Sequence, residues 1–231
     1  MNIAELQTWM NSRGASLVVD GKGGPATRAA ILSVFANKQA PAATDGDVKA
    51  IASKLDDPTG QRLRAVAKVE SGGASFLPDG LPKILYERHY FWRLTQGSYG
   101  RTEWSWPQSG GYTVDADKDG VNDSWEKLAQ AACRDPYAAF SSVSIGKFQV
   151  MGAHWNKLGY ASPLDMMFAA SRSEAAHYDM LARFILHFDL GEAFRRLSVR
   201  PDDCIAFAQG YNGPAYRKNS YHLKLAMAMQ Q

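Results

Sequence analysis

The sequence is poor in cysteine, in net charge and in long apolar runs, and each absence narrows the class of protein. Its two cysteines, Cys133 and Cys204, form no CxxC motif; we expect buried free thiols, with a disulfide between them as the open alternative. No apolar run is long enough to cross a bilayer, which excludes a membrane-spanning helix. A net charge of +3, without an arginine stripe interleaved with aromatic residues, argues against a nucleic-acid partner.

Two other signals are missing. The first residues, MNIAELQTWMNSRG, lack the basic and apolar regions of a signal peptide, so we expect the protein to be made in the cytoplasm and to stay there at first. His177 and His187 belong to no HExxH motif or other metal-ligand spacing. We therefore expect both histidines to be structural.

What is present is the composition of an ordinary globular protein, with 45% hydrophobic and 21% charged residues in a chain of 231. Apolar residues recur at helical spacing in nearly every periodic segment, which predicts a mainly α fold. A short β-hairpin is expected near residues 99–114. The length allows one sizeable core and a small accessory module.

Residues 61–73, QRLRAVAKVESGG, predict a short helix that ends on a glutamate, before the glycines Gly72 and Gly73. Glu70 shares one helical face with apolar residues, so its side chain is expected to face the core. A buried carboxyl at a helix C-terminus resists ionisation, because burial and the helix dipole both favour the protonated form. Glu70 is therefore a candidate general acid; the alternative is a surface glutamate at a frayed helix end. The apolar residues of that face are Leu63, Val66 and Ala67.

The N-terminal residues predict two short amphipathic helices around a turn at Asp20 and Gly21. The stretches LQTWMNSRG and DGKGGPATRAAILSVF resemble the three-helix peptidoglycan-binding module of many cell-wall hydrolases. One departure is Gly23, where that module usually has an aliphatic or aromatic residue. The resemblance implies a wall-binding module at residues 1–38, with a generic helical hairpin as the alternative. The matching positions are Leu6, Gln7, Gly14, Asp20, Gly21, Gly24, Pro25, Thr27 and Ala30.

Residues 39–45 are small and polar and are expected to form a linker. Thr44 or Asp45 is expected to cap the helix that follows. The remaining residues, 46–231, would form the second domain.

The segment PKILYERHYFWRL embeds charged residues in an apolar run. Charged side chains in such a run are rarely fully solvated, so Glu87 is expected to be paired or functional. The structural alternative is an ion pair between Arg88 and a glutamate that holds a loop.

Residues 115–126, DADKDGVNDSWE, place oxygen ligands at the spacing of an EF-hand calcium loop. Gly120 stands at the sixth position, where the backbone must turn sharply. We expect a structural Ca²⁺ site, because five carboxylates this close would otherwise repel one another; a solvated acidic turn is the alternative. The expected ligands are Asp115, Asp117, Asp119, the carbonyl of Val121, Asp123 and Glu126.

Two later motifs complete a pattern. SIGKFQVMG resembles the GxxQxM turn of goose-type lysozymes and lytic transglycosylases, and YNGPAY resembles a segment of the same superfamily in which a Tyr-Asn pair lies beside the catalytic glutamate. In the order VESGG, YERH, SIGKFQVMG and YNGPAY, the motifs resemble the N-acetylmuramidase domain of phage endolysins. The implied fold is a small three-helix bundle followed by a lysozyme-like α-helical catalytic domain.

The resemblance implies hydrolysis of the β-1,4 bond between N-acetylmuramic acid and N-acetylglucosamine in peptidoglycan. Glu70 would be the catalytic acid and Glu87 the second carboxylate, with no cofactor needed for catalysis. The implied sugar-binding residues are Ser144, Gln149, Tyr211 and Asn212.

Two alternatives stay open: a lytic transglycosylase that forms 1,6-anhydro products, and a non-catalytic wall-binding virion protein. We expect a monomer, and the resemblance implies that it reaches the wall through a separate membrane-permeabilising partner.

Overall fold

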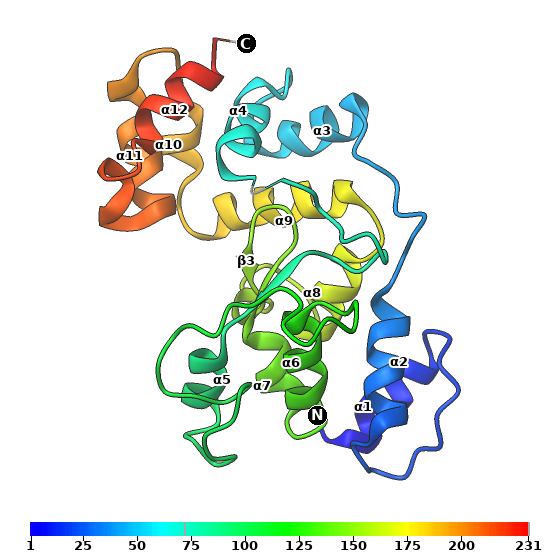
Figure 1. Ribbon diagram of the computed structural model, residues 1–231. Helices are drawn as coiled ribbons and strands as arrows, with labels where there is room; N and C mark the ends of the chain where they lie inside the picture. Colours follow the sequence, from blue (N-terminus) through cyan, green and yellow to red (C-terminus); the bar gives the residue numbers. More distant parts are fainter. Residues whose placement is uncertain (72, 231) are drawn as a thin grey trace. The chain divides into compact units, whose positions relative to one another are not determined.

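The computed structural model describes residues 1–71 and 73–230. It is mainly α-helical with one small antiparallel sheet, which confirms the predicted fold class (Figure 1). The chain forms two compact units that do not follow its order. Unit 1 consists of Met1–Ala40 and Phe76–Arg172, and unit 2 of Pro41–Ser75 and Ser173–Gln231.

Unit 1 begins with the two predicted N-terminal helices, α1 (Ile3–Asn11) and α2 (Pro25–Phe35), so residues 1–40 contribute two helices and not three. The buried amide of Gln7 holds the loop between them. Its Oε1 accepts hydrogen bonds from the Asp20 and Gly21 N–H groups, and its Nε2 donates to Asp20 Oδ1 at 2.9 Å. Residues that carry the resemblance to the wall-binding module therefore form the polar network that shapes this loop.

The rest of unit 1 surrounds the sheet, whose strand order is β1-β2-β3 with Ser144 paired to Leu85 on one side and Met151 on the other. The elements are β1 (Ile84–Tyr86), α5 (Arg88–Leu94), α6 (Asp123–Ala132), α7 (Pro136–Ser141), β2 (Val143–Ile145), β3 (Val150–Met151), η2 (Gly152–His154) and α8 (Pro163–Ala170).

The prediction of a β-hairpin near residues 99–114 is wrong. That segment contains bends and one isolated bridge between Thr102 and Ser105. Its aromatic residues pack on the side of α5 instead: the rings of Tyr99 and Trp104 lie 5.7 and 5.6 Å from that of Phe91. The segment is thus held by ring packing and not by a strand pair.

The core of unit 1 is centred on Phe35, which is completely buried at the end of α2. Its ring lies 5.7 Å from that of Trp9 in α1 and 5.2 Å from that of Phe140 in α7. It also contacts Trp125 of α6 and Phe168 of α8, at 5.8 and 6.3 Å. The N-terminal helices therefore share one aromatic core with the helices that follow residue 76.

Gly23, which departs from the wall-binding pattern, lies directly against the C-terminal end of α6. A Cβ atom added there would lie 2.4 Å from the carbonyl oxygen of Cys133 and 2.6 Å from its Cβ. Since real Cβ contacts are not that short, a larger residue would force the loop away from α6. The packing of unit 1 thus explains the glycine.

We expect Phe35→Ala to lower the free energy of unfolding of unit 1 by about 3–5 kcal/mol, because it leaves a cavity between four aromatic residues. Denaturant unfolding followed by tryptophan fluorescence would measure the loss, with Val18→Ala as the control, since Val18 is 81% exposed. Equal unfolding midpoints for the two variants would show that the N-terminal helices are dispensable for unit 1.

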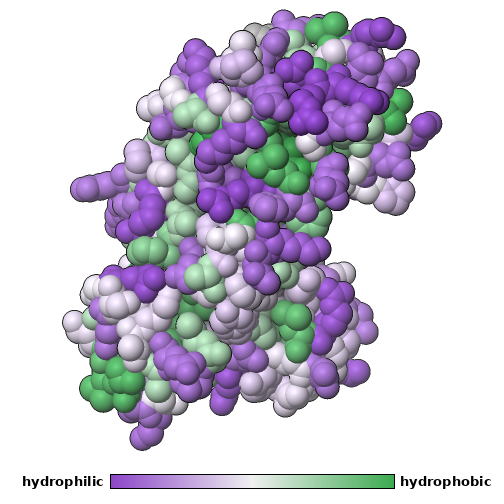
Figure 2. Space-filling model, turned by 180° about the vertical axis from the view of Figure 1, so that it is seen from behind, coloured by the Kyte–Doolittle hydropathy of each residue, from purple (hydrophilic) through white to green (hydrophobic). Residues whose placement is uncertain are grey.

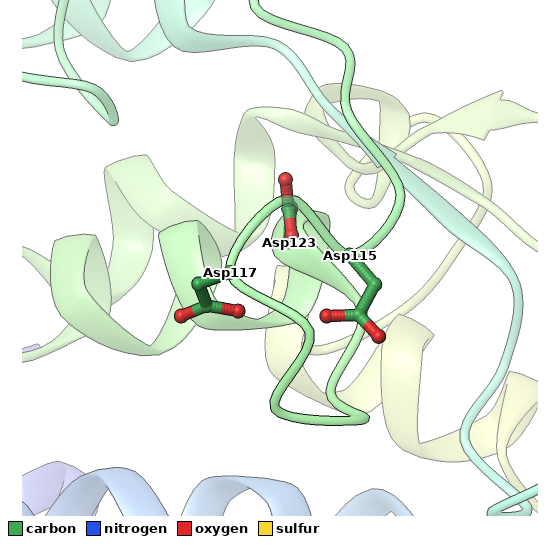
Figure 3. Close-up of side chains that lie close together, drawn as sticks. All are labelled: Asp115, Asp117 and Asp123. Atoms are coloured by element: carbon green, nitrogen blue, oxygen red, sulfur yellow. The ribbon is translucent and has the colours of Figure 1, made fainter.

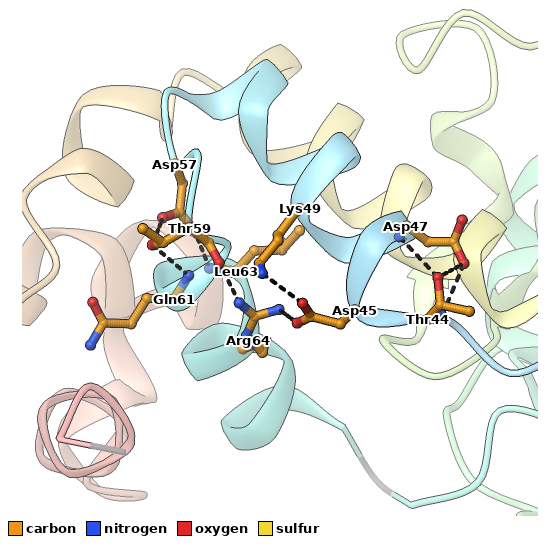
Figure 4. A network of polar contacts seen from close by, with 9 residues as sticks. All are labelled: Thr44, Asp45, Asp47, Lys49, Asp57, Thr59, Gln61, Leu63 and Arg64. Atoms are coloured by element: carbon orange, nitrogen blue, oxygen red, sulfur yellow. Dashed lines mark hydrogen bonds and ion pairs between the residues drawn. The ribbon is translucent and has the colours of Figure 1, made fainter.

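Unit 2 contains α3 (Asp45–Ala52), η1 (Ser53–Leu55), α4 (Gln61–Glu70), α9 (Glu174–His187), α10 (Gly191–Arg195), α11 (Pro201–Asn212), η3 (Gly213–Arg217) and α12 (Tyr221–Ala228). Thr44 caps α3 as predicted, in a reciprocal capping box with Asp47 (Figure 4).

A second polar network fixes the start of α4. The buried carboxylate of Asp57 accepts a hydrogen bond from the Leu63 N–H at 3.0 Å, and Arg64 forms an ion pair of 2.7 Å with Asp45 of α3 (Figure 4). Asp57 is completely buried, so its hydrogen bonds hold the first turn of the helix firmly. The opposite end of that helix carries Glu70.

Both cysteines are buried free thiols, as predicted, with Cys133 in unit 1 and Cys204 in unit 2. Among the described helices, none is both long and apolar enough to cross a membrane. The face drawn in Figure 2 is largely hydrophilic, and its hydrophobic residues form separate groups.

Candidate active site

Glu70 is the last residue of α4, where the sequence placed the end of the helix. The apolar residues on its face, Leu63, Val66 and Ala67, are buried, and Glu70 itself is half-buried. Gly72 lies outside the described residues. The predicted placement of a carboxyl group at the edge of the core is confirmed.

Asn212 is the direct partner of this carboxyl group. Its Nδ2 donates a hydrogen bond of 2.9 Å to Glu70 Oε1. Asn212 ends α11, and Gly213 takes a positive φ of 68° directly after it, as the YNGP turn requires. Two helices therefore end beside Glu70, and the partial negative charge of a helix C-terminus disfavours an ionised carboxylate.

Burial raises the pKa of Glu70, and the hydrogen bond from Asn212 and the charge of Lys224 oppose this only in part. A fraction of the side chain therefore keeps its proton at a higher pH than a solvated glutamate would. This is the property that a general acid needs near neutral pH.

Tyr211 forms an aromatic wall next to Asn212. Its ring stacks on that of Phe207 at 5.7 Å and meets the edge of Phe184 at 5.3 Å. Burial and then the charge of Glu70 raise the pKa of Tyr211, so its hydroxyl stays protonated. The structure thus brings Glu70, Tyr211 and Asn212 together in unit 2, as the motifs predicted.

Two further residues near Glu70 were missed. Tyr221, whose pKa is raised by burial and then by the charge of Glu70, opens α12, and Lys224 follows one turn later. The Lys224 ammonium lies 5.3 Å from the Tyr221 ring centroid. The i, i+3 spacing of Tyr221 and Lys224 indicates that the two side chains share a helix face. No motif in the sequence, however, predicts that this helix lies near Glu70.

We expect Asn212→Ala to shift the alkaline limb of the pH–rate profile to higher pH. The hydrogen bond from Asn212 lowers the pKa of Glu70, so its loss raises that pKa, and a general acid then stays protonated further into the alkaline range. The measurement is kcat/KM on solubilised glycan across the pH range. Asn219→Ala, an exposed asparagine of the same unit, is the control, and an unmoved limb for Asn212→Ala would contradict this role for Glu70.

Glu87 lies in unit 1, directly before α5. Tyr112 donates a hydrogen bond of 2.6 Å to Glu87 Oε2, and His89 Nδ1 lies 3.2 Å from the same oxygen. The expectation that Glu87 is paired is confirmed. The hydrogen-bond partner is Tyr112, from the loop after α5, and not Arg88.

Ser144 and Gln149 also belong to unit 1, on the hairpin of β2 and β3. The Ser144 hydroxyl contacts the sulfur of Met151 at 3.1 Å, and the Gln149 amide donates to the Gly146 carbonyl at 2.8 Å. Gln149 has a positive φ of 51°, which is uncommon for a residue with a side chain. Their predicted contacts with sugar remain a prediction.

The acidic loop brings its carboxylates together in the described structure. One oxygen each of Asp115, Asp117 and Asp123 lie within 4.8 Å of one another (Figure 3), and so do oxygens of Asp117, Asp119 and Glu126. Ligands of one Ca²⁺ at about 2.3–2.6 Å are separated by at most roughly 5 Å, so the arrangement fits such an ion. Burial and then the neighbouring aspartates raise the pKa of Glu126, as expected for crowded carboxylates.

The helical fold and a half-buried glutamate held by an asparagine at two helix ends fit a lysozyme-like glycoside hydrolase, which needs a carboxylic acid to protonate the glycosidic oxygen. A family model described as N-acetylmuramidase matches residues 60–231. The chain belongs to the N-acetylmuramidase family and is a peptidoglycan hydrolase.

A solved relative supports the same conclusion. The chain is similar to the crystal structure of the Burkholderia AP3 phage endolysin, with 31% sequence identity and a TM-score of 0.70, over 99% of this chain and 93% of that one. No curated protein sequence gives a match.

Proposed function

We propose that the chain is an endolysin in which Glu70 protonates the oxygen of the β-1,4 bond between N-acetylmuramic acid and N-acetylglucosamine. The hydrogen-bonded, half-buried carboxyl group with a raised pKa carries this proposal. Protonation lets the bond between C1 and the leaving oxygen break, which leaves positive charge on the ring. Tyr211 and Asn212 would hold the sugar.

In this proposal Glu87 supplies the second carboxylate that the oxocarbenium-like transition state needs, directly or by activating water. The hydrogen bond from Tyr112 supports a defined orientation for its carboxylate. Ser144 and Gln149 would contribute further sugar contacts.

Loss of turbidity of purified sacculi tests the function, with Glu70→Gln as the matched variant. A non-catalytic wall-binding protein would leave the turbidity unchanged with both proteins. The family match favours hydrolysis over the transglycosylase reaction.

We further propose that residues 1–38 bind the bacterial wall. The polar network of Gln7, Asp20 and Thr27 supports this, since these motif residues shape the loop before α2. Before lysis the protein would stay in the host cytoplasm as a monomer and would reach the wall after a separate partner permeabilises the membrane.

Finally, we propose that the loop 115–126 binds a structural Ca²⁺. Chelation is expected to lower the melting temperature on the order of 5–10 °C, the shift for an ion present at about 100 times its Kd. Asp119→Ala should abolish this response, whereas Glu192→Gln, which changes a highly exposed carboxylate of unit 2, should keep it. Identical melting curves of the wild type with and without chelator would remove Ca²⁺ from the account.

A further inference from the structure

A polar cavity of about 520 Å³ lies in unit 1 beside the Glu87–Tyr112 pair. Two of its lining residues, Arg88 and Gly111, are the chain neighbours of Glu87 and Tyr112. The proton transfer proposed for Glu70 makes no use of this cavity, and the proposed Ca²⁺ site uses only its carboxylates.

Two cations line the cavity. Arg88 Nε donates to the Gln108 carbonyl at 3.3 Å, and its guanidinium lies 5.7 Å from the Trp106 ring. Lys127 Nζ donates to the Gly111 carbonyl at 2.7 Å. Among the described residues, no carboxylate lies within 4.0 Å of either cation. Both therefore keep donors for an anionic ligand.

The backbone holds Arg88 in place. A Cβ atom added at Gly111 would lie 2.9 Å from Arg88 Nη1, and one at Gly110 would lie 3.4 Å from Nη2. The two glycines thus leave room for the guanidinium beside the chain. A fixed guanidinium loses little conformational freedom when it binds a carboxylate with two parallel hydrogen bonds.

The cavity also has carboxylates in its lining. Asp117, Asp123 and Glu126, three of the proposed Ca²⁺ ligands, line it together with Glu103. A divalent cation held by the first three would offset two of their three negative charges. Arg88 and Lys127 are then the groups of the lining that can pair with a carboxylate.

We propose that Arg88 and Lys127 bind a carboxylate of the short peptides that branch from peptidoglycan, so that this cavity is a peptide subsite. This rests on the proposed function. N-acetylglucosamine carries no charge, whereas the peptides carry free carboxylates. An arginine with available donors therefore selects for the peptide part of the substrate.

The test compares peptide-bearing glycan strands with strands from which an amidase has removed the peptides. For Arg88→Gln and for Lys127→Met, the ratio of kcat/KM on the first substrate to that on the second should fall about ten-fold from the wild-type value, as for one lost charge-assisted hydrogen bond. Arg93→Gln is the matched control, because Arg93 is on the same helix and lies over Tyr90, 4.2 Å from its ring.

An unchanged ratio would overturn the proposal. Amidase-treated strands keep the lactyl carboxylate of muramic acid, so equal losses on both substrates would mean that the cations hold that group or support the fold. Arg88→Lys, which keeps the charge, should recover part of the ratio. Failure of the muramidase function would look different, since wild-type protein would then cleave neither substrate.

A direct measurement complements the kinetics. A soluble peptide released from the wall should bind wild-type protein in a calorimetric titration, and the same peptide with amidated carboxyl groups should bind at least about ten-fold more weakly. Equal affinities for the two peptides would contradict carboxylate recognition.

Discussion

Glu70→Gln is expected to lower the rate of peptidoglycan hydrolysis by about 10²–10⁴-fold, the contribution of a general acid. Glutamine matches the shape of the glutamate and occupies the same place at the end of α4, but it has no acidic proton to give. The loss should therefore appear in kcat, with little change in KM. Turbidity loss of purified sacculi and kcat on soluble glycan measure it.

The same variant should fold normally. Burial raises the pKa of Glu70 above its unfolded value, so at neutral pH the ionised side chain adds no stability that glutamine would lose. Glu192→Gln is the control, because Glu192 is a highly exposed glutamate of unit 2 that pairs with Arg196. Wild-type rates in Glu70→Gln would leave only sugar adhesion as a role for this site.

Glu87→Gln is expected to lower turnover by about 10²-fold or more without a loss of stability, because the oxocarbenium-like transition state needs a second carboxylate. Tyr112→Phe provides the comparison, since it removes the hydrogen bond to Glu87 and keeps the carboxylate. We expect it to reduce kcat far less.

A purely structural pair would behave differently. Both variants would then lower the melting temperature by similar amounts and leave kcat near the wild-type value. Steady-state rates together with melting curves separate the two outcomes.

Local features were predictable from the sequence. The end of α4 at Glu70, the cap at Thr44 and the acidic loop all depend on residues within a few positions of one another, where spacing determines geometry. The Glu70–Asn212 hydrogen bond joins residues 142 positions apart. It could be anticipated only because the YNGP motif resembles a known family.

Contacts without a motif could not be predicted. Tyr112 reaches Glu87 from a segment without regular structure, and Lys224 approaches Glu70 from the last helix. The division of the chain into two units could not be predicted either. It depends on the ring contacts that place Phe35 in one core with residues after position 76, and such contacts give no periodic pattern in the sequence. The ring packing of residues 99–114 on α5 likewise had no sequence signal, and the hairpin predicted there is absent from the described structure.

Mass spectrometry of the fragments released from purified peptidoglycan tests the central claim most directly. If Glu70 delivers its proton for hydrolysis, the wild-type fragments end in reducing N-acetylmuramic acid, and the Glu70→Gln variant releases essentially none. Fragments lighter by one water, with 1,6-anhydro ends, would contradict hydrolysis, and normal fragments from the variant would contradict the role of Glu70.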